Sequence, residues 1–360
     1  MKVSKTQRYA SKCINPKSIL NDVPDIIAPR VSVVIIGFNG LAHIDLCLSS
    51  TLDQSLPSDD YEVILLDNAS NDGMPEYVEK NYPQVRVIRF QQNYGFNEAC
   101  NRSLSLINGD FIVFLPQDTI VHRKWLFSLI HLAESDQNIK VCWTNTINPW
   151  AHEFDARDRV KLAKHIYYPE ITILGFTQCK VLPYKANPLF SLGVAGTSFG
   201  IKRDFLGELG PMLDGNFFHY CGDTDLGLRV NLLGYRVVMS PEAIVYHIDT
   251  DKSFINLSLF IKYFFGTVDR ILLYYKCMSW AEFILFSPFL IVGIAAKVFS
   301  IRLPSPIQWG LFCLVLPFSP LIFFVSLFFA GKVNKERTII KQSRKRNKFW
   351  LLRKIFSINQ

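Results

Sequence analysis

The strongest constraint on the fold is a regular alternation of apolar runs and amphipathic segments between residues 31 and 133. The apolar runs are rich in β-branched and aliphatic residues, as expected of strands buried on both faces, and they comprise "VSVVIIGF" (31–38), "YEVILLDN" (61–68), "VRVIRF" (85–90) and "FIVFLPQDT" (111–119). The segments between and after them have apolar residues at helical spacing and predict helices over 41–52, 74–82, 97–107 and 120–133. This order predicts an α/β fold with a mostly parallel sheet.

The second half of the chain is less regular. Residues 135–195 are rich in aromatic residues and proline, which predicts loops and irregular strands. Residues 217–249 predict a helix that ends at Gly234, because glycine is the usual C-cap residue, followed by the strands "YRVVM" and "AIVYH". His247 closes the second of these strands.

The charge distribution excludes a nucleic-acid-binding body. The chain has a net charge of +8, but residues 332–354 hold ten Lys/Arg and one Glu, and the remainder holds 29 basic and 30 acidic residues. Duplex binding requires a basic face on the folded body, and this body is close to neutral. The eight cysteines are scattered, with no CxxC pair or metal-ligand spacing, which favours a reduced compartment over a disulfide framework.

The apolar C-terminal third predicts membrane association. Residues 1–29 read as an N-terminal arm, 30–252 as the α/β domain and 253–282 as amphipathic helices at a membrane interface. Residues 283–331 read as two membrane segments, the second with 29 uncharged residues from Leu303 to Gly331. Since basic tails stay in the cytoplasm, residues 332–360 favour a two-pass hairpin, with a re-entrant hairpin as the alternative and the α/β domain on the cytoplasmic side.

Polar residues follow four successive predicted strands, at the sheet edge where ligands of open α/β folds bind. They are Phe38 with Asn39, then Asp67, Asn93 and Asp118. Taken singly, each group has a structural explanation, such as turn formation near Asn93 or capping of the next helix by the Asp118–Thr119 pair. Four such groups at one edge favour a ligand site. No GxGxxG is present, so a dehydrogenase-type dinucleotide site has little support.

The segment "FFHYCGDTDLGLR" places Asp223 and Asp225 immediately before a predicted helix. Helix capping by Asp223 or Thr224, with Asp225 favourable to the helix dipole, is the simplest explanation. Likewise, a single histidine at a strand end is usually structural. His247 becomes a candidate metal ligand if the fold brings it close to Asp118.

Six segments, in order along the chain, resemble glycosyltransferase family 2. They are "VSVVIIGFN", "LLDNASNDG", "NYGFNEACN", the strand ending in "QDT", "FFHYCGDTDLGLR" and "GYRVVMSPEAIVYH". The resemblance runs from about Val31 to about Asp249 and is strongest to the rhamnosyltransferase-like branch that extends bacterial surface glycans. It implies a GT-A type fold that binds a nucleotide-diphospho-sugar, transfer with inversion, and a glycan or lipid-linked glycan acceptor.

The resemblance also implies roles for individual residues. Asp67 would bind the nucleotide base, in a pocket lined by Phe38, Asn39 and Asn93. Asp118, with His247, would hold a divalent cation, Mg²⁺ or Mn²⁺, on the diphosphate, because a hard cation stabilises the charge on the leaving group.

Asp223 would be the general base that accepts the proton of the acceptor hydroxyl. Two positions depart from the family pattern. Pro116 stands where Asn or Asp is usual, which removes one oxygen ligand, and Gly222 stands where Glu precedes the base. These departures leave two alternatives open: another nucleotide-sugar or nucleotidyl transfer, and a catalytically weakened membrane scaffold.

Overall fold

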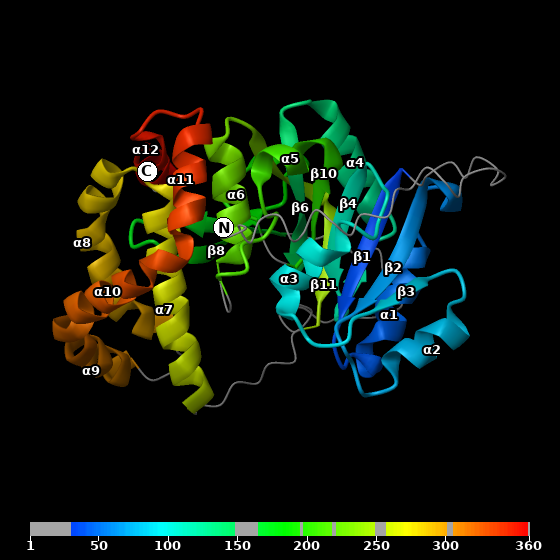
Figure 1. Cartoon of the computed structure of the whole chain (residues 1–360), viewed down its shortest axis with the longest axis horizontal. Coiled ribbons are helices and arrows are strands. Elements are labelled where there is room, and N and C mark those ends of the chain that lie inside the picture. Colours follow the sequence, from blue (N-terminus) through cyan, green and yellow to red (C-terminus); the bar gives the residue numbers. More distant parts are fainter. Residues whose placement is uncertain are drawn as a thin grey trace, which may run out of the picture.

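The computed structural model describes residues 30–147, 165–194, 197–217, 221–248, 257–300 and 305–358. A nine-stranded sheet forms the centre of the molecule, in the order β3-β2-β1-β4-β10-β6-β11-β5, with β9 paired to β11. Helices cover the sheet, and a separate group of helices from the C-terminal third packs at one end (Figure 1).

The first half of the sheet is parallel, as predicted. It consists of β1 (Val31–Gly37), β2 (Tyr61–Asp67), β3 (Arg86–Arg89) and β4 (Phe111–Pro116). All seven residues of β1 are buried because helices cover both faces. Successive residues of this strand enter different cores: Val33 and Ile35 pack into one, and Val34 and Ile36 into the other. The connecting helices are α1 (Leu41–Leu52), α2 (Met74–Asn81) and α3 (Gly95–Ser103).

The second half of the sheet is mixed, so the prediction of a mostly parallel sheet is wrong here. Strand β10 (Phe199–Lys202) lies antiparallel between β4 and β6 (Ile139–Ile147). Strand β11 (Arg236–His247) is parallel to β6 but antiparallel to β5 (Thr119–Val121) and β9 (Leu189–Phe190). Strand β6 was hidden in the sequence because the buried polar residues Thr144 and Asn145 interrupt its apolar pattern.

Two other boundaries differ from the predictions. Residues 119–121 form β5, so the next helix, α4 (Trp125–Ser135), begins at Trp125 and Thr119 is not its N-cap. Strand β11 is one strand of 12 residues rather than two, with a register shift between Ser240 and Ile244. Helix α6 (Gly222–Leu232) ends as predicted, with Gly234 at φ 93°.

A small hairpin and a short helix complete the α/β body. The hairpin pairs β7 (His165–Ile171) with β8 (Thr177–Pro183), and α5 spans Leu206–Leu209. The hairpin turn reaches the C-terminal helices, where the hydroxyl of Tyr274 donates to the carbonyl of Gly175 at 3.1 Å.

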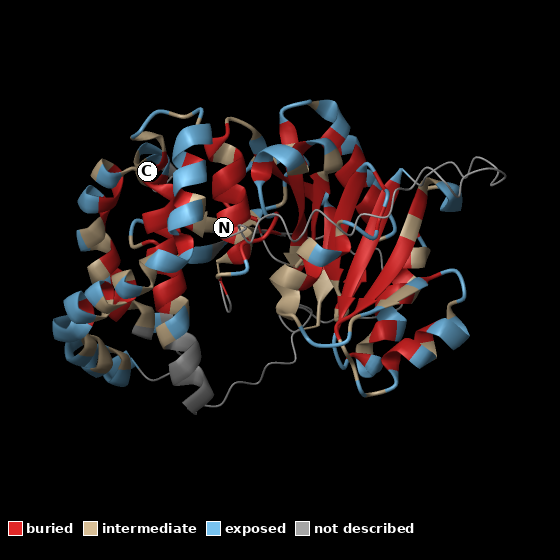
Figure 2. Ribbon diagram, in the orientation of Figure 1, coloured by how far each residue is buried: buried red, intermediate tan, exposed pale blue. Residues whose placement is uncertain are grey.

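The C-terminal helices pack in a third core, which they share with Ile171, Leu228 and Leu232 of the α/β body. They are α7 (Leu257–Cys277), α8 (Trp280–Ala296), α9 (Ser305–Val315), α10 (Ser319–Phe328), α11 (Asn334–Ser343) and α12 (Trp350–Ile358). The second half of α7 is buried (Figure 2), so the prediction that residues 253–282 lie at a membrane interface is wrong for this half. Its charge at Lys276 is matched inside the protein by Asp214 and Asp225 rather than by lipid headgroups.

By length and composition, one helical run in the described chain is long and apolar enough to cross a membrane, Ser305–Ser343. This run contains α9, α10 and α11 with 3₁₀ turns between them. The other segment expected to span contains α8, an apolar helix of 17 residues.

Candidate active site

The carboxyl ends of the main strands lie at one edge of the sheet. Strands β1 to β4 are parallel to one another, and β6 and β11 share their direction because β10 runs antiparallel to both β4 and β6. The residues predicted to bind a ligand follow these ends: Phe38 and Asn39 after β1, Asp67 at the end of β2, Asn93 after β3 and Asp118 after β4. This edge is the candidate active site.

Side-chain to backbone hydrogen bonds connect the loops that follow β1 and β2. Asn39 adopts a positive φ of 49°; its N–H donates to the Ser70 hydroxyl at 2.9 Å, and its side-chain oxygen accepts from the N–H of Asn71 at 2.9 Å. The Asp72 carboxylate accepts from the N–H of Met74, at the start of α2, and from that of Leu41, at the start of α1. Asp72 therefore joins the starts of α1 and α2, whereas Ser70 binds the neighbouring loop.

Asp67 is only 3% exposed, and its carboxylate accepts from the N–H of Ser70 at 3.1 and 3.3 Å. The next residue, Asn68, reaches the loop after β3: its side-chain oxygen accepts from the N–H of Tyr94, and its NH₂ group donates to the Asn93 side chain, both at 2.9 Å. Asn93 also accepts from the N–H of Gly95 at 2.8 Å, as a turn residue does. The bridging role of Asn68 was missed in the sequence.

Gln117 fixes the backbone beside the exposed ring of Phe38. Its side-chain oxygen accepts from the N–H of Phe38 at 2.8 Å, and its NH₂ group donates to the carbonyl of the same residue at 2.9 Å. A Cβ at Gly40 would lie 2.0 Å from the Gln117 oxygen, so this glycine leaves room for the clamp. In the sequence, the glycines on either side of Phe38 and Asn39 are the feature that indicates this close approach of Gln117.

Asp118 and His247 come together, as the metal hypothesis requires. Thr119 pairs with His247 across β5 and β11, and the two side chains face each other with 3.4 Å between Oδ2 and Nε2. Both are partly open, with 29% of the Asp118 and 34% of the His247 side chain exposed. Burial opposes ionisation of Asp118, but the hydrogen bond and charge of His247 outweigh it and lower the pKa of the carboxyl; His43, missed in the sequence, contributes in the same direction.

The donor types at this pair fit a divalent cation. One carboxylate oxygen and one imidazole nitrogen suit Mn²⁺ or a similar ion, with a diphosphate and water as the remaining ligands. Within the described ranges, no group of three or more His, Cys, Asp or Glu side chains is arranged to hold a metal. Pro116 offers no side-chain ligand, and its carbonyl accepts from the Thr119 hydroxyl at 2.7 Å.

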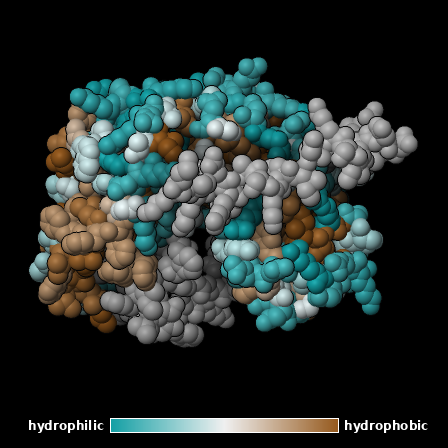
Figure 3. Space-filling view, in the orientation of Figure 1, coloured by the Kyte–Doolittle hydropathy of each residue, from teal (hydrophilic) through white to brown (hydrophobic). Residues whose placement is uncertain are grey.

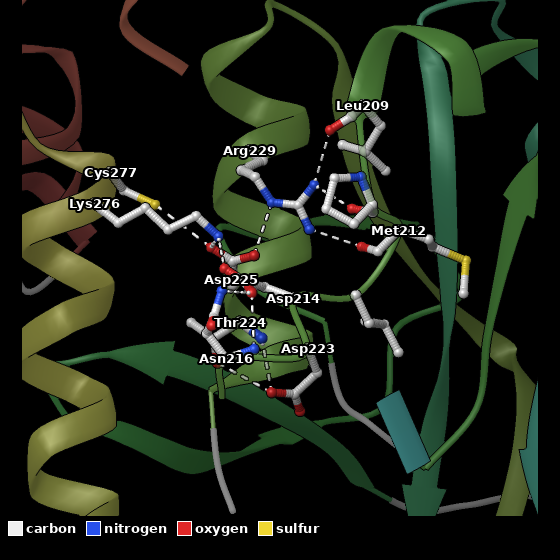
Figure 4. Close-up of polar contacts among 12 residues, drawn as sticks. Leu209, Met212, Asp214, Asn216, Asp223, Thr224, Asp225, Arg229, Lys276 and Cys277 are labelled. Carbon is white, nitrogen blue, oxygen red and sulfur yellow. Dashed lines mark hydrogen bonds and ion pairs between the residues drawn. The ribbon is translucent and has the colours of Figure 1, made fainter. Parts of the chain in front are cut away.

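The two aspartates at the start of α6 have different surroundings (Figure 4). Asp223 is partly exposed, and its carboxylate accepts from the N–H of Thr224 at 2.7 Å. Asp225 is fully buried and forms ion pairs of 2.7 Å with both Arg229 and Lys276. Burial opposes ionisation of Asp225, but these two cations outweigh it and lower the pKa of its carboxyl. Asp225 is therefore held inside a buried ion-pair cluster, whereas the carboxylate of Asp223 is partly exposed.

Asn97 fills the space that a side chain at position 222 would need. A Cβ at Gly222 would lie 2.5 Å from the Asn97 nitrogen. The same NH₂ group donates to the carbonyl of Phe217 at 3.0 Å, so α3 holds the segment that leads to α6. Because α3 follows β3 at the carboxyl edge of the sheet, this contact brings the start of α6 close to that edge (Figure 1). Asp223 is the second residue of α6.

Comparison with known proteins gives a consistent class. The family model described as glycosyl transferase family 2 matches residues 32–201, just under half of the chain. Glycosyltransferase AglE of Haloferax volcanii is 31% identical over 101 residues, which cover 27% of this chain and 33% of that protein. Cholesterol galactosyltransferase of Borreliella burgdorferi is 30% identical over 115 residues, 31% of this chain and 32% of that protein. The chain thus spans about a third of the length of these two relatives.

The fold extends further than the sequence similarity. A crystal structure of GalNAc-T7 with UDP, GalNAc and Mn²⁺ superposes with a TM-score of 0.63 at 17% identity, over 92% of this chain and 58% of that one. Residues 32–201 are thus similar to glycosyltransferase family 2, and the superposition shows a shared fold, a GT-A fold with a mixed sheet.

Proposed function

We propose that this protein is an inverting glycosyltransferase that moves a sugar from a nucleotide-diphospho-sugar to a hydroxyl of a glycan acceptor. The observation that carries the proposal is the common position of an open Asp118–His247 pair and a partly exposed Asp223 at the ligand-binding edge of a GT-A type sheet. The family match over residues 32–201 supports the same activity.

The donor nucleotide would lie over the linked loops after β1, β2 and β3. Phe38 offers an exposed ring for stacking, and Asn39, Asp67 and Asn93 offer polar atoms for the base. Since Asp67 and Asn39 already hold these loops together through Ser70, the pocket would be preorganised rather than assembled on binding.

Asp118 and His247 would hold Mg²⁺ or Mn²⁺ on the donor diphosphate. A cation there supplies charge stabilisation for the departing nucleoside diphosphate. The co-crystallised Mn²⁺ and UDP of the GalNAc-T7 structure support divalent-cation use. With two protein ligands, the affinity for free metal should be low, and the donor should raise it.

Asp223 would accept the proton of the acceptor hydroxyl as the hydroxyl attacks the anomeric carbon. A hydroxyl is a poor nucleophile at neutral pH, and removing its proton during attack is the task of a general base. Asp225 is unsuited to this task because Arg229 and Lys276 enclose its carboxylate. Attack from the side opposite to the leaving group gives inversion.

The acceptor would be a lipid-linked glycan, with the catalytic domain on the cytoplasmic side of the cell membrane and a deoxyhexose such as rhamnose as one candidate sugar. The exposed apolar helices and the basic tail support a position at the membrane, where a lipid-linked acceptor also resides. One relative is named cholesterol galactosyltransferase and another poly(ribitol-phosphate) beta-glucosyltransferase, so their names give a lipid and a polymer as acceptors, which supports transfer to a lipid-linked glycan in surface-glycan synthesis.

A donor panel tests the proposal. Purified protein is incubated with UDP-, GDP- and dTDP-sugars in the presence of Mg²⁺ or Mn²⁺, and both binding and slow donor hydrolysis are measured. At least one donor should bind and be hydrolysed. The alternative, a membrane scaffold with a GT-A fold, is motivated by Pro116 and Gly222 and predicts neither binding nor hydrolysis with any donor.

A further inference from the structure

The C-terminal helices present a continuous apolar surface to solvent. We call it the α8–α10 face; its exposed members include Ile284 and Leu285 of α8, Leu314 of α9, and Leu321, Phe324 and Phe328 of α10, which are 56 to 87% exposed. Figure 3 shows this face as a brown region over the same helices. Exposed apolar patches of this kind mark sites of protein or membrane contact.

The chemistry of the face fits lipid rather than a folded protein partner. Among the described residues between Phe283 and Gly331, Lys297 is the one charged residue, and its ammonium lies 5.6 Å from the ring centre of Phe176, back toward the hairpin. A protein interface carries a polar rim and hydrogen bonds, whereas a hydrocarbon phase needs neither. Cations follow immediately beyond the face, with Lys332, Lys335 and Lys341 exposed. Such a cluster complements anionic lipid headgroups.

The helices of the face are too short to span a bilayer separately. Helices α9 and α10 have 11 and 10 residues, and at roughly 1.5 Å per residue each is about 15–17 Å long. The hydrocarbon core is about 30 Å thick. The run Ser305–Ser343 changes direction at the 3₁₀ turns Leu316–Phe318 and Phe329–Val333, so α9, α10 and α11 do not form one rod (Figure 1).

Helix α8 is also prevented from crossing as an independent span. Its opposite side is packed against the protein: Phe286, Leu290 and Ile294 are buried in the third core. A Cβ at Gly293 would lie 2.5 Å from the carbonyl oxygen of Leu174, so the hairpin turn touches the helix backbone directly. A lipid-spanning helix could not keep these contacts with the α/β body.

We propose that the α8–α10 face inserts into one leaflet of an anionic bilayer from the side of the catalytic domain, without crossing the bilayer. Lys332, Lys335 and Lys341 then lie at headgroup level. This deepens the membrane role within the proposed function but does not depend on sugar transfer. It also differs from the two-pass hairpin expected from the sequence, because Ser305, at the start of α9, stays on the catalytic side.

Vesicle flotation tests the face. Full-length wild type, Leu321→Asn/Phe324→Asn/Phe328→Asn and a control, Phe127→Asn/Val181→Asn/Phe190→Asn, are mixed with vesicles of phosphatidylcholine and phosphatidylglycerol in high-salt buffer, which screens the charge of the tail. The control replaces exposed apolar residues of the α/β body. Wild type and control should float with the vesicles. The bound fraction of the first triple variant should be lower by about tenfold or more. Equal flotation of all three, or self-association of wild type through the face without flotation, would overturn the proposal.

Thiol labelling distinguishes one-leaflet insertion from two passes. Ser305→Cys and Ser357→Cys are placed separately in a Cys313→Ala background, since Cys313 is exposed. Inside-out membrane vesicles of the expression host are treated with a membrane-impermeant maleimide. Both thiols should react to the same extent before detergent is added. Reaction of Ser305→Cys only after permeabilisation would establish the two-pass hairpin instead. Donor hydrolysis, measured in detergent on the flotation variants, reports separately on the catalytic proposal.

Discussion

Asp223 and Asp225 lie on the same turn of α6 but meet different partners. The carboxylate of Asp223 faces away from the buried ion pairs in Figure 4, and that of Asp225 lies within them. If Asp223 is the general base, Asp223→Asn should lower transfer by about 10²–10⁴-fold, because this is the usual contribution of a base. Donor binding and the thermal unfolding midpoint should stay close to wild type. Retained transfer in Asp223→Asn would refute the assignment.

Asp225→Asn should affect stability. The substitution removes one of the two carboxylates that balance the buried cations Arg229 and Lys276. This loss should lower the free energy of unfolding by roughly 3–5 kcal/mol. Because folding lowers the pKa of this carboxyl, its contribution is present at neutral pH and is lost as pH falls below the unfolded value of about 3.9. In urea unfolding, the free energies of unfolding of wild type and Asp225→Asn should therefore differ strongly at neutral pH and less at about pH 3. A difference in the free energy of unfolding that does not change with pH would contradict this explanation.

Asp118→Ala should weaken binding of the donor more than that of the acceptor, because the carboxylate would hold the cation on the diphosphate. His247→Ala removes the other donor of the pair and should raise the cation concentration needed for half-maximal activity. Separate binding measurements with donor and acceptor test the effect of Asp118→Ala. Activity titrated with Mn²⁺ and Mg²⁺ after chelation measures the cation requirement of His247→Ala. Full activity of the wild type in excess chelator would exclude the metal role of both residues.

At the scale of elements, Lys276 ties α7 to the segments around the candidate base. Its ammonium forms ion pairs of 2.7 Å with Asp225 on α6 and with Asp214 in the preceding loop. Asp214 in turn accepts from the N–H of Asn216 at 2.9 Å, which orders the approach to α6. Arg229 extends the network to three backbone carbonyls, those of Leu209, Pro211 and Met212. The C-terminal helices and the catalytic body are thus joined by a buried, charge-balanced cluster.

Lys276→Met should destabilise the whole chain by roughly 3–5 kcal/mol, because it leaves Asp214 and Asp225 with one cation between them. The double variant Lys276→Met/Asp214→Asn restores the charge balance, because Asp225 keeps its ion pair with Arg229, and it should recover part of this loss. Chemical unfolding curves measure both. Lys345→Met, at an exposed ion pair with Glu208, is the control and should change stability by less than about 1 kcal/mol. Equal effects of Lys276→Met and Lys345→Met would disprove the role of the cluster.

The strands that could be predicted from the sequence are those with an uninterrupted or nearly uninterrupted apolar run. Strands β1, β2 and β4 are mostly apolar because both faces are covered, and their apolar runs predicted them correctly. Strand β6 was missed because Thr144 and Asn145 are buried there, with the Thr144 hydroxyl donating to the carbonyl of Ser198 at 3.4 Å. A local pattern cannot show a polar residue whose partner is more than fifty positions away.

At the scale of the whole molecule, the positions of the candidate site residues followed from topology. Parallel strands place their carboxyl ends together, so Asp67, Asn93 and Asp118 could be assigned to one edge without knowing any contact. The residues that were missed, Asn68, Gln117 and His43, act across two loops or elements, and such contacts depend on the folded geometry. The burial of α7 was missed for the same reason, since the partners of Lys276 lie about 50 and 60 positions earlier.

The attachment of the whole molecule can be tested by washing membranes of expressing cells first with high salt and then with detergent. The tail has a net charge of +9 over residues 332–354, and each exposed cation contributes about 1 kcal/mol near an anionic surface, an attraction that salt screens. Burial of the α8–α10 face in hydrocarbon does not respond to salt in this way. We therefore expect the protein to stay bound through the salt wash and to be released by detergent. The variant Leu321→Asn/Phe324→Asn/Phe328→Asn keeps the full tail charge but loses the α10 part of the face, so electrostatic attraction should dominate its binding and salt should release it. Release of the wild type by salt alone would mean that the tail is the anchor and that the apolar face lies outside the bilayer.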